Sequence, residues 1–107
     1  MAGQDISKLK LGPIGDRVMY ENEMVRVWDF VVEPGRNKGW HKHELPYVII
    51  PMTDGDIELE SAITGQIDRP KGVQIGSPIW RDAGEVHDLR NVGTETYRNI
   101  LIELKPR

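Results

Sequence analysis

His41 and His43 are separated by a single lysine in a stretch that the sequence predicts to be a β-strand. Because side chains alternate between the two faces of a strand, both histidines project from one face and Lys42 from the other. Two imidazoles on one face can each give a ring nitrogen to the same divalent metal ion. The chain has three histidines, and the third, His87, lies in another glycine-flanked stretch, residues 76–91. These residue types predict a three-histidine metal site if the fold brings the two stretches together.

A His-x-His pattern alone also fits simpler interpretations. The pair could be two surface histidines at the end of a strand, or one core histidine whose hydrogen bonds are satisfied. The absence of cysteine excludes disulfides, thiolate metal ligands and a cysteine nucleophile. Any metal ion must therefore be bound by nitrogen and oxygen atoms.

The residues around the histidines follow a longer spacing pattern. A glycine precedes the first histidine by six positions, and a Gly-x-x-His-x-x-x-Asn run surrounds the third. This pattern resembles the two-part signature of the cupin superfamily. The positions that match the signature are Gly35, His41, His43, Gly55, Gly76, Gly84, His87 and Asn91. The wider sequence resembles the small single-domain cupins, some of which are associated with the breakdown of β-alanine or related amino acids.

The resemblance implies an all-β fold, the cupin double-stranded β-helix, which is a jelly-roll-like barrel. It also implies a divalent metal ion bound by His41, His43 and His87, with Fe, Zn, Ni and Mn all open as its identity. The glutamate of the first cupin motif is missing, since its place falls on Tyr47 or, with a longer gap, on Val48. What remains resembles the three-histidine site of the thiol dioxygenase-type cupins.

Tyr47 and Glu85 are candidates for catalysis. Together with Glu44, they are also candidates for a fourth metal ligand. Tyr47 could hydrogen-bond a metal-bound molecule or act as an acid or base, although an amphipathic residue at a strand edge is equally consistent. Glu85 has the same strand parity as His87, whereas Glu44 points away from the histidine face by parity. The alternative for Glu85 is the solvated end of a strand. Arg26 could bind a carboxylate substrate, but a solvated edge arginine is the simpler interpretation.

About nine short strands must position these residues. Eleven glycines and seven prolines in 107 residues, with many short apolar runs, favour an all-β domain. Residues 24–33 are apolar on both faces, as in a sheet that is covered on each side. Asp54–Gly55 predicts a hairpin turn with positive φ. In the last predicted strand, residues 96–104, three aliphatic residues alternate with polar partners, namely Ile100, Ile102 and Leu104.

We expect a single domain over residues 17–107, preceded by a segment over residues 1–16 that is either a frayed tail or an edge strand. The net charge of −3 and the lack of a basic stripe argue against a nucleic-acid partner. The longest apolar run, residues 47–52, is too short to span a membrane, and no secretory signal is recognisable. The sequence thus favours a cytoplasmic protein. It also predicts a homodimer, because a short apolar chain gains from covering a sheet edge.

The function implied by the resemblance is a metal-dependent enzyme that acts on a small polar or carboxylate metabolite. Dioxygenase, lyase and isomerase chemistry all remain open. The alternative is a non-catalytic cupin that binds a metabolite or a metal ion.

Overall fold

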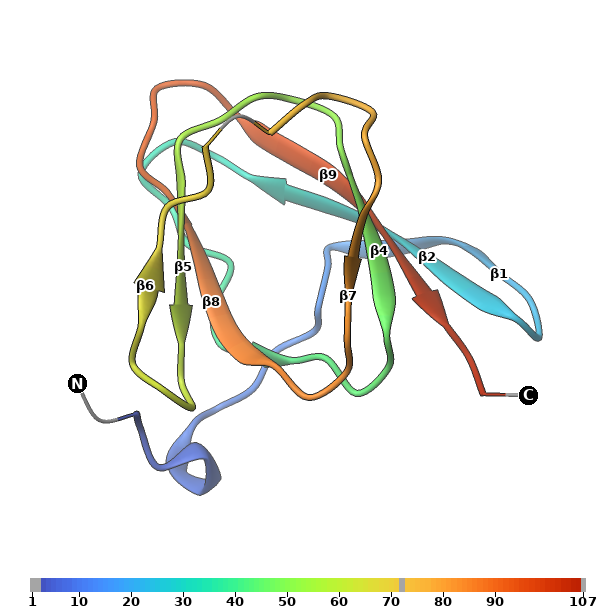
Figure 1. The fold of residues 1–107 in the computed structure, drawn as a ribbon, viewed down its shortest axis with the longest axis horizontal. Coiled ribbons are helices and arrows are strands. Elements are labelled where there is room, and N and C mark those ends of the chain that lie inside the picture. Colours follow the sequence, from blue (N-terminus) through green and yellow to red (C-terminus); the bar gives the residue numbers. More distant parts are fainter. Residues whose placement is uncertain (1–2, 72, 107) are drawn as a thin grey trace.

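Nine strands and one short 3-10 helix form the described part of the chain (Figure 1). The computed structural model describes residues 3–71 and 73–106. In chain order the elements are η1 (Ile6–Lys8), β1 (Arg17–Glu21), β2 (Val25–Val32), β3 (His41–Lys42), β4 (Tyr47–Pro51), β5 (Ile57–Ser61), β6 (Ile67–Asp68), β7 (Ile79–Arg81), β8 (Val86–Asn91) and β9 (Tyr97–Leu104). The all-β prediction is confirmed. No helix in the described residues is long and apolar enough to cross a membrane.

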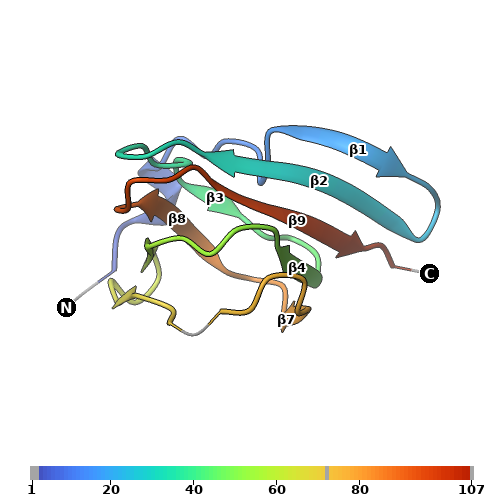
Figure 2. The same cartoon turned by 90° about the horizontal axis from the view of Figure 1, so that it is seen from above.

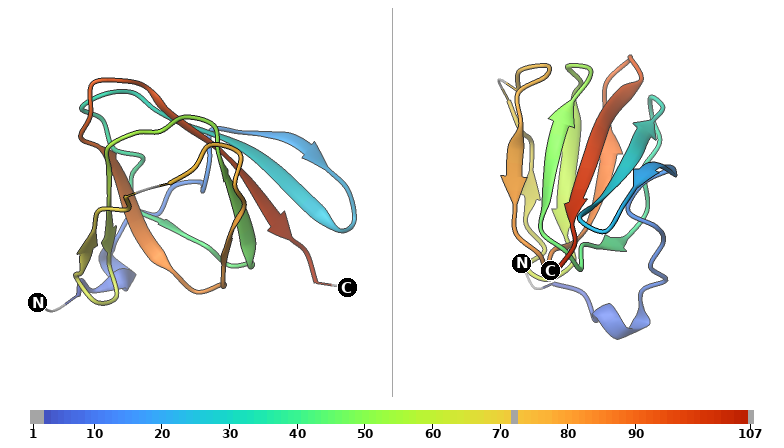
Figure 3. Two further views of the ribbon diagram at one scale, coloured as in Figure 1. Left: turned by 45° about the horizontal axis from the view of Figure 1, so that its top comes forward. Right: turned by 90° about the vertical axis from the view of Figure 1, so that its right-hand side faces the viewer.

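The strands form two antiparallel sheets that face each other. One sheet has the order β1-β2-β9-β4-β7, which the right-hand view of Figure 3 shows from β7 to β1, and the other has the order β3-β8-β5-β6. From β2 onward the chain mostly alternates between the sheets, with only β5 and β6 adjacent in both sequence and space. This winding places segments that are distant in sequence opposite one another. In Figures 1 and 2 the β1–β2 hairpin projects beyond the smaller sheet.

The Asp54–Gly55 turn differs from the prediction. It connects β4 to β5, which lie in different sheets, so it does not close a hairpin. Gly55 is also absent from the glycines with positive φ in the described residues. A Cβ atom at Gly55 would lie 3.0 Å from Cδ1 of Tyr97, so close packing rather than backbone conformation favours glycine here.

The core lies between the two sheets. Its buried members come from both sheets and from the N-terminal segment: Ile14, Phe30, Val32, Tyr47, Ile57, Leu89, Tyr97 and Leu101. Along β9 the buried side chains alternate with half-buried ones. The aliphatic residues that the pattern singled out, such as Ile100 and Ile102, occupy the half-buried outer face. The inner face instead carries two polar residues, Asn99 and Glu103, which are only 3% and 5% exposed.

The segment before β1 packs along the domain. Backbone amides of Gln4 and Gly12 donate hydrogen bonds to the carbonyls of Ala62 (2.7 Å) and Trp40 (2.8 Å), and Ile14 reaches the core. The contact with Trp40 fixes the loop that leads into β3.

Candidate metal centre

The pairing of β3 with β8 brings the first and third histidines together. His41 lies directly opposite His87 in this antiparallel ladder, so the two side chains project from the same face. His43 follows one residue after β3, and its backbone amide donates to the carbonyl of Glu85 at 2.9 Å. Gly84 returns the contact, donating from its amide to the His43 carbonyl at 2.8 Å. Its φ of 112° is a conformation that glycine adopts without strain.

The three imidazole rings form one compact cluster. Their centroids are 4.7 Å (His41 to His87), 5.0 Å (His41 to His43) and 4.8 Å (His43 to His87) apart. The Nε2 atoms of His43 and His87 are 3.0 Å apart. Two nitrogens that each bind one ion at about 2.0–2.1 Å, with an angle between about 90° and 109°, are about 2.9–3.4 Å apart. The separation therefore fits two ligands of one divalent ion.

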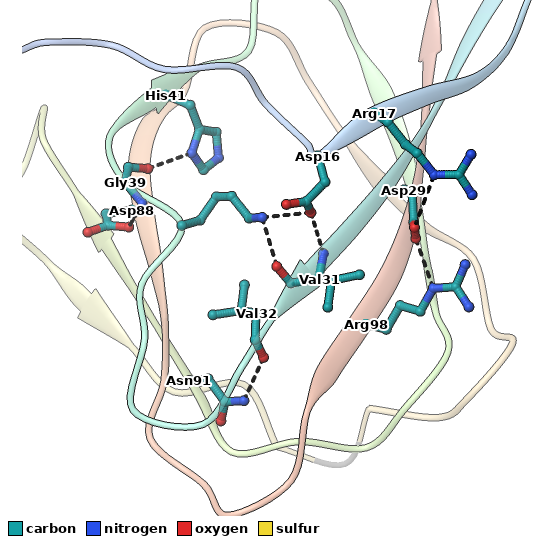
Figure 4. Close-up of polar contacts among 11 residues, drawn as sticks. Asp16, Arg17, Asp29, Val31, Val32, Gly39, His41, Asp88, Asn91 and Arg98 are labelled. Atoms are coloured by element: carbon teal, nitrogen blue, oxygen red, sulfur yellow. Dashed lines mark hydrogen bonds and ion pairs between the residues drawn. The ribbon is translucent and has the colours of Figure 1, made fainter.

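A backbone carbonyl sets the tautomer of His41. Its Nδ1 lies 2.8 Å from the carbonyl oxygen of Gly39 (Figure 4). Because that oxygen can only accept, Nδ1 carries the proton and Nε2 keeps its lone pair for a metal ion. The Gly39 amide is in turn held by Asp88 Oδ1 at 2.8 Å. No pattern in the sequence identifies this acceptor.

Burial keeps the cluster neutral. It is the largest cause of the low pKa of all three histidines, which is about 4 for His41, about 2 for His43 and about 4 for His87. The positive charge of a neighbouring histidine lowers the pKa of His41 and His43 further, and the charge of Arg81 acts on His87. Neutral imidazoles are the form that binds metal ions.

One polar atom of the cluster still lacks a partner. His43 Nδ1 is buried and makes no hydrogen bond within the described part of the chain. Among the described residues, the group of side chains that could hold an ion consists of the three histidines, with one nitrogen from each within 4.8 Å of the others. The donor set therefore fits a divalent ion bound by nitrogen ligands.

Tyr47 and Glu85 lie beside the cluster. The Tyr47 ring stacks on His43, with centroids 3.9 Å apart, and its hydroxyl donates to Glu85 Oε2 at 3.1 Å. That same oxygen is 3.8 Å from Nδ1 of His87, on the side of the ring away from His43. Burial first, and then the charge of Glu85, raise the pKa of Tyr47, so its hydroxyl stays protonated.

The other candidate residues point elsewhere. The side chain of Glu44 is 76% exposed and pairs with Lys42 at 3.9 Å, as the parity of the strand predicted. Arg26 pairs with Glu21 and Glu103 and does not line the cavity beside the histidines.

The cluster forms the polar wall of a cavity of about 80 Å³. Most of the remaining wall is apolar, for example Phe30 and Leu89, but Arg81 and Asn99 also line it. Sequence reasoning missed both polar residues. Arg81 could have been found only from its pairing with Tyr47 across the β4–β7 ladder, which no sequence pattern indicates.

The chain resembles known proteins in both sequence and structure. No protein-family model matches it. The β-alanine degradation protein BauB of Pseudomonas aeruginosa is 32% identical over 88 residues, which cover 82% of this chain and 90% of that relative. A cupin domain from Bordetella pertussis is 30% identical with a TM-score of 0.74, covering 84% of this chain and 91% of the other. A protein with a double-stranded β-helix domain from Klebsiella pneumoniae, 17% identical, has a TM-score of 0.65 over 94% of this chain and 81% of its own.

Proposed function

The chain belongs to the cupins, as a small member similar to BauB, and we propose that it is a metal-dependent enzyme acting on a small polar or carboxylate metabolite. The observation that carries the proposal is the convergence of three neutral, buried imidazoles on the wall of a cavity. We assign His41, His43 and His87 as the ligands of a divalent ion, with Fe, Zn, Ni and Mn as candidates.

A divalent ion at this position supplies a Lewis acid and, if it is iron, access to oxygen chemistry. Three protein ligands leave coordination positions free for water or substrate. Dioxygenase, lyase and isomerase reactions are therefore the classes to test. Because BauB is named for β-alanine degradation, β-alanine and related acids are reasonable first substrates.

We assign catalytic roles to Tyr47 and Glu85. Their 3.1 Å hydrogen bond joins a protonated hydroxyl to a carboxylate at the side of the cavity where His87 lies. The Glu85 side chain is 46% exposed and in contact with solvent, whereas Tyr47 is buried and fixed by its stack on His43. This pair can orient a bound molecule and hold or pass one of its protons.

The test begins with the metal content of the untagged protein, because a polyhistidine tag would add competing ligands. We expect about one divalent ion per chain after loading, measured by inductively coupled plasma mass spectrometry. Iron-loaded protein is then assayed for oxygen consumption, and Zn-, Ni- and Mn-loaded protein for turnover of short carboxylic acids. Absence of stoichiometric metal contradicts the proposal. Metal without turnover favours the alternative, a non-catalytic cupin that binds a metabolite or metal ion.

We also propose a homodimer. β1 and β7 are the outer strands of the larger sheet, and an exposed strand edge can pair with another chain. The β1 edge carries Val18, which is 41% exposed, and Tyr20, which is 58% exposed, and Met24 in the following turn is 48% exposed. Covering these side chains with a second copy would remove apolar surface from water.

A further inference from the structure

Arg81 connects the histidine cavity to the surface. It ends β7 and lies opposite Tyr47 in the β4–β7 ladder, so both side chains project from the inner face of the sheet. β7 is the edge strand of that sheet, and Arg81 remains exposed. The residue lines the cavity of about 80 Å³ and also an adjoining surface pocket of about 330 Å³. The two spaces share five lining residues: Leu59, Pro70, Arg81, Glu85 and His87.

The guanidinium group of Arg81 has no carboxylate partner within residues 3–71 and 73–106. Arg69, which also lines the surface pocket, is paired with Glu58. Of the acidic residues nearest to Arg81 in sequence, Asp82 accepts a hydrogen bond from the Trp80 indole at 3.0 Å, and Glu85 accepts from Tyr47. An arginine at a cavity mouth that has no carboxylate partner in the described part of the protein can bind the anionic group of a ligand.

The interior of the cavity limits the size and polarity of the rest of a ligand whose anionic group binds Arg81. Apart from Asn99, its wall beyond the polar end is mostly apolar, and its volume has room for only about five water-sized groups. Asn99 donates from its amide nitrogen to the Tyr97 hydroxyl at 2.9 Å, while its Oδ1 is buried without a partner in the described residues. The cavity therefore suits a short, mostly apolar chain of a few atoms.

We propose that Arg81 binds the carboxylate of a short-chain carboxylic acid at the mouth of the cavity, with the hydrocarbon chain of the acid inside. The planar guanidinium matches a carboxylate with two parallel hydrogen bonds. The mostly apolar wall of the cavity then favours an anion that carries a hydrocarbon chain over inorganic phosphate. This inference rests on the proposed function, since it names the substrate class of the same site and the residue that selects it.

The experiment measures the binding of butyrate to metal-loaded and metal-free protein by NMR titration and calorimetry. Octanoate, inorganic phosphate and butylamine are titrated in parallel. Arg81→Gln is expected to weaken butyrate binding about 10- to 100-fold, because a hydrogen-bonded charge pair is lost. Arg81→Lys keeps the positive charge but lacks the planar guanidinium. Its affinity for butyrate is expected to lie between those of the unmodified protein and Arg81→Gln. Arg69→Gln is the matched control, and its butyrate affinity is expected to equal that of the unmodified protein.

Each outcome decides the inference. Butyrate binding that Arg81→Gln weakens and Arg69→Gln does not, with octanoate, phosphate and butylamine all weaker, supports it. Undetectable butyrate binding, equal binding to Arg81→Gln, or phosphate that binds as tightly as butyrate overturns it. The metal content of the same samples separates this inference from the proposed function. Arg81-dependent butyrate binding in a protein that takes up no metal would support the carboxylate site and contradict the proposed metal-dependent enzyme.

Discussion

Tyr47 and His43 stack almost in parallel, with their ring centroids 3.9 Å and their planes 13° apart. The cupin signature places a glutamate at this point of the first motif. Val48, the other position considered for it, pairs with Trp80 and Ile102 and lies on the opposite face from Tyr47. A tyrosine that packs on one histidine and hydrogen-bonds Glu85 thus occupies the side of the cluster where a carboxylate ligand would be expected.

Tyr47→Phe keeps the stack and removes the hydroxyl. We expect unfolding free energy to fall by about 0.5–1.5 kcal/mol, the net contribution of one hydrogen bond. Turnover of a substrate is expected to fall at least about tenfold if the hydroxyl orients it, with metal content unchanged. Urea denaturation, metal analysis and steady-state kinetics measure the three effects. Tyr20→Phe, on the exposed β1 edge, is the control. Turnover that matches that control would remove Tyr47 from catalysis.

His87→Ala tests the metal ligands. Loss of an outer hydrogen-bond partner of a ligand costs about 10- to 100-fold in metal affinity, so loss of the ligand itself is expected to cost more. Metal content after dialysis should drop from about one ion per chain to a small fraction. Glu44→Gln, whose side chain is exposed beside the site, should retain full occupancy. Circular dichroism confirms folding, and His87→Gln provides a second variant of closer size. Full occupancy in both His87 variants would exclude this histidine as a ligand.

The clustering of the histidines was easier to predict from the sequence than the surroundings of the cluster. The His-x-His parity predicted that His41 and His43 share a face, because alternation along a strand is a local property, and the resemblance to the cupin signature added His87. The partners of the cluster depend on which strands become neighbours. Asp88 on β8 accepts from the amide of Gly39, whose carbonyl contacts His41, and Arg81 reaches the cavity only through the β4–β7 pairing.

Tertiary contacts also decide which face of the last strand, β9, is buried. Its aliphatic residues alternate with polar ones in the sequence, yet the inner face is the one with Tyr97, Asn99, Leu101 and Glu103. Polar residues can face inward there because a cavity and neighbouring polar side chains lie between the sheets. Trp28, for example, donates to Glu103 at 2.6 Å. Such partners are set by tertiary structure rather than by local pattern.

Acidification is expected to destabilise the metal-free protein. In the folded state burial lowers the pKa of the histidines from 6.5 to about 4 for His41 and His87, and further for His43. Below pH 6.5 the unfolded chain therefore takes up protons that the folded chain does not, and stability is lost as the pH falls from about 6.5 toward 4. The slope is at most about 1.4 kcal/mol per pH unit for each histidine.

NMR measures this directly, because the chain contains only three histidines and all belong to the cluster. Untagged protein in the presence of a chelator is expected to show no imidazole that titrates near pH 6.5 before unfolding begins. Urea denaturation at pH 7 and pH 5 gives the accompanying loss of stability. Three rings that titrate close to 6.5 would mean that the cluster is open to water in solution.

The homodimer can be tested at the β1 edge. Light scattering should report twice the 12.2 kDa mass of the chain at micromolar concentration. Tyr20→Lys and Val18→Lys place charges on the exposed edge and are expected to shift the protein toward the monomer, since charged edge residues oppose strand pairing. Glu23→Lys, in the adjoining turn, controls for the added charge. A mass of 12.2 kDa for the unmodified protein rules the dimer out.

Gly39→Ala should separate backbone strain from metal binding. Gly39 has a φ of 97° and open space where a Cβ would lie, so the cost of alanine comes from the backbone alone, about 1–2 kcal/mol. Gly35 has a φ of 76° and equally open surroundings, but its amide donates to the carbonyl of Asn91 rather than supporting a histidine. Both variants are therefore expected to lose similar stability in urea denaturation. Only Gly39→Ala should also weaken metal binding, by about 10- to 100-fold, because a shifted carbonyl no longer fixes the proton on His41 Nδ1. Equal metal affinity in the two variants would show that the Gly39 carbonyl does not orient the ligand.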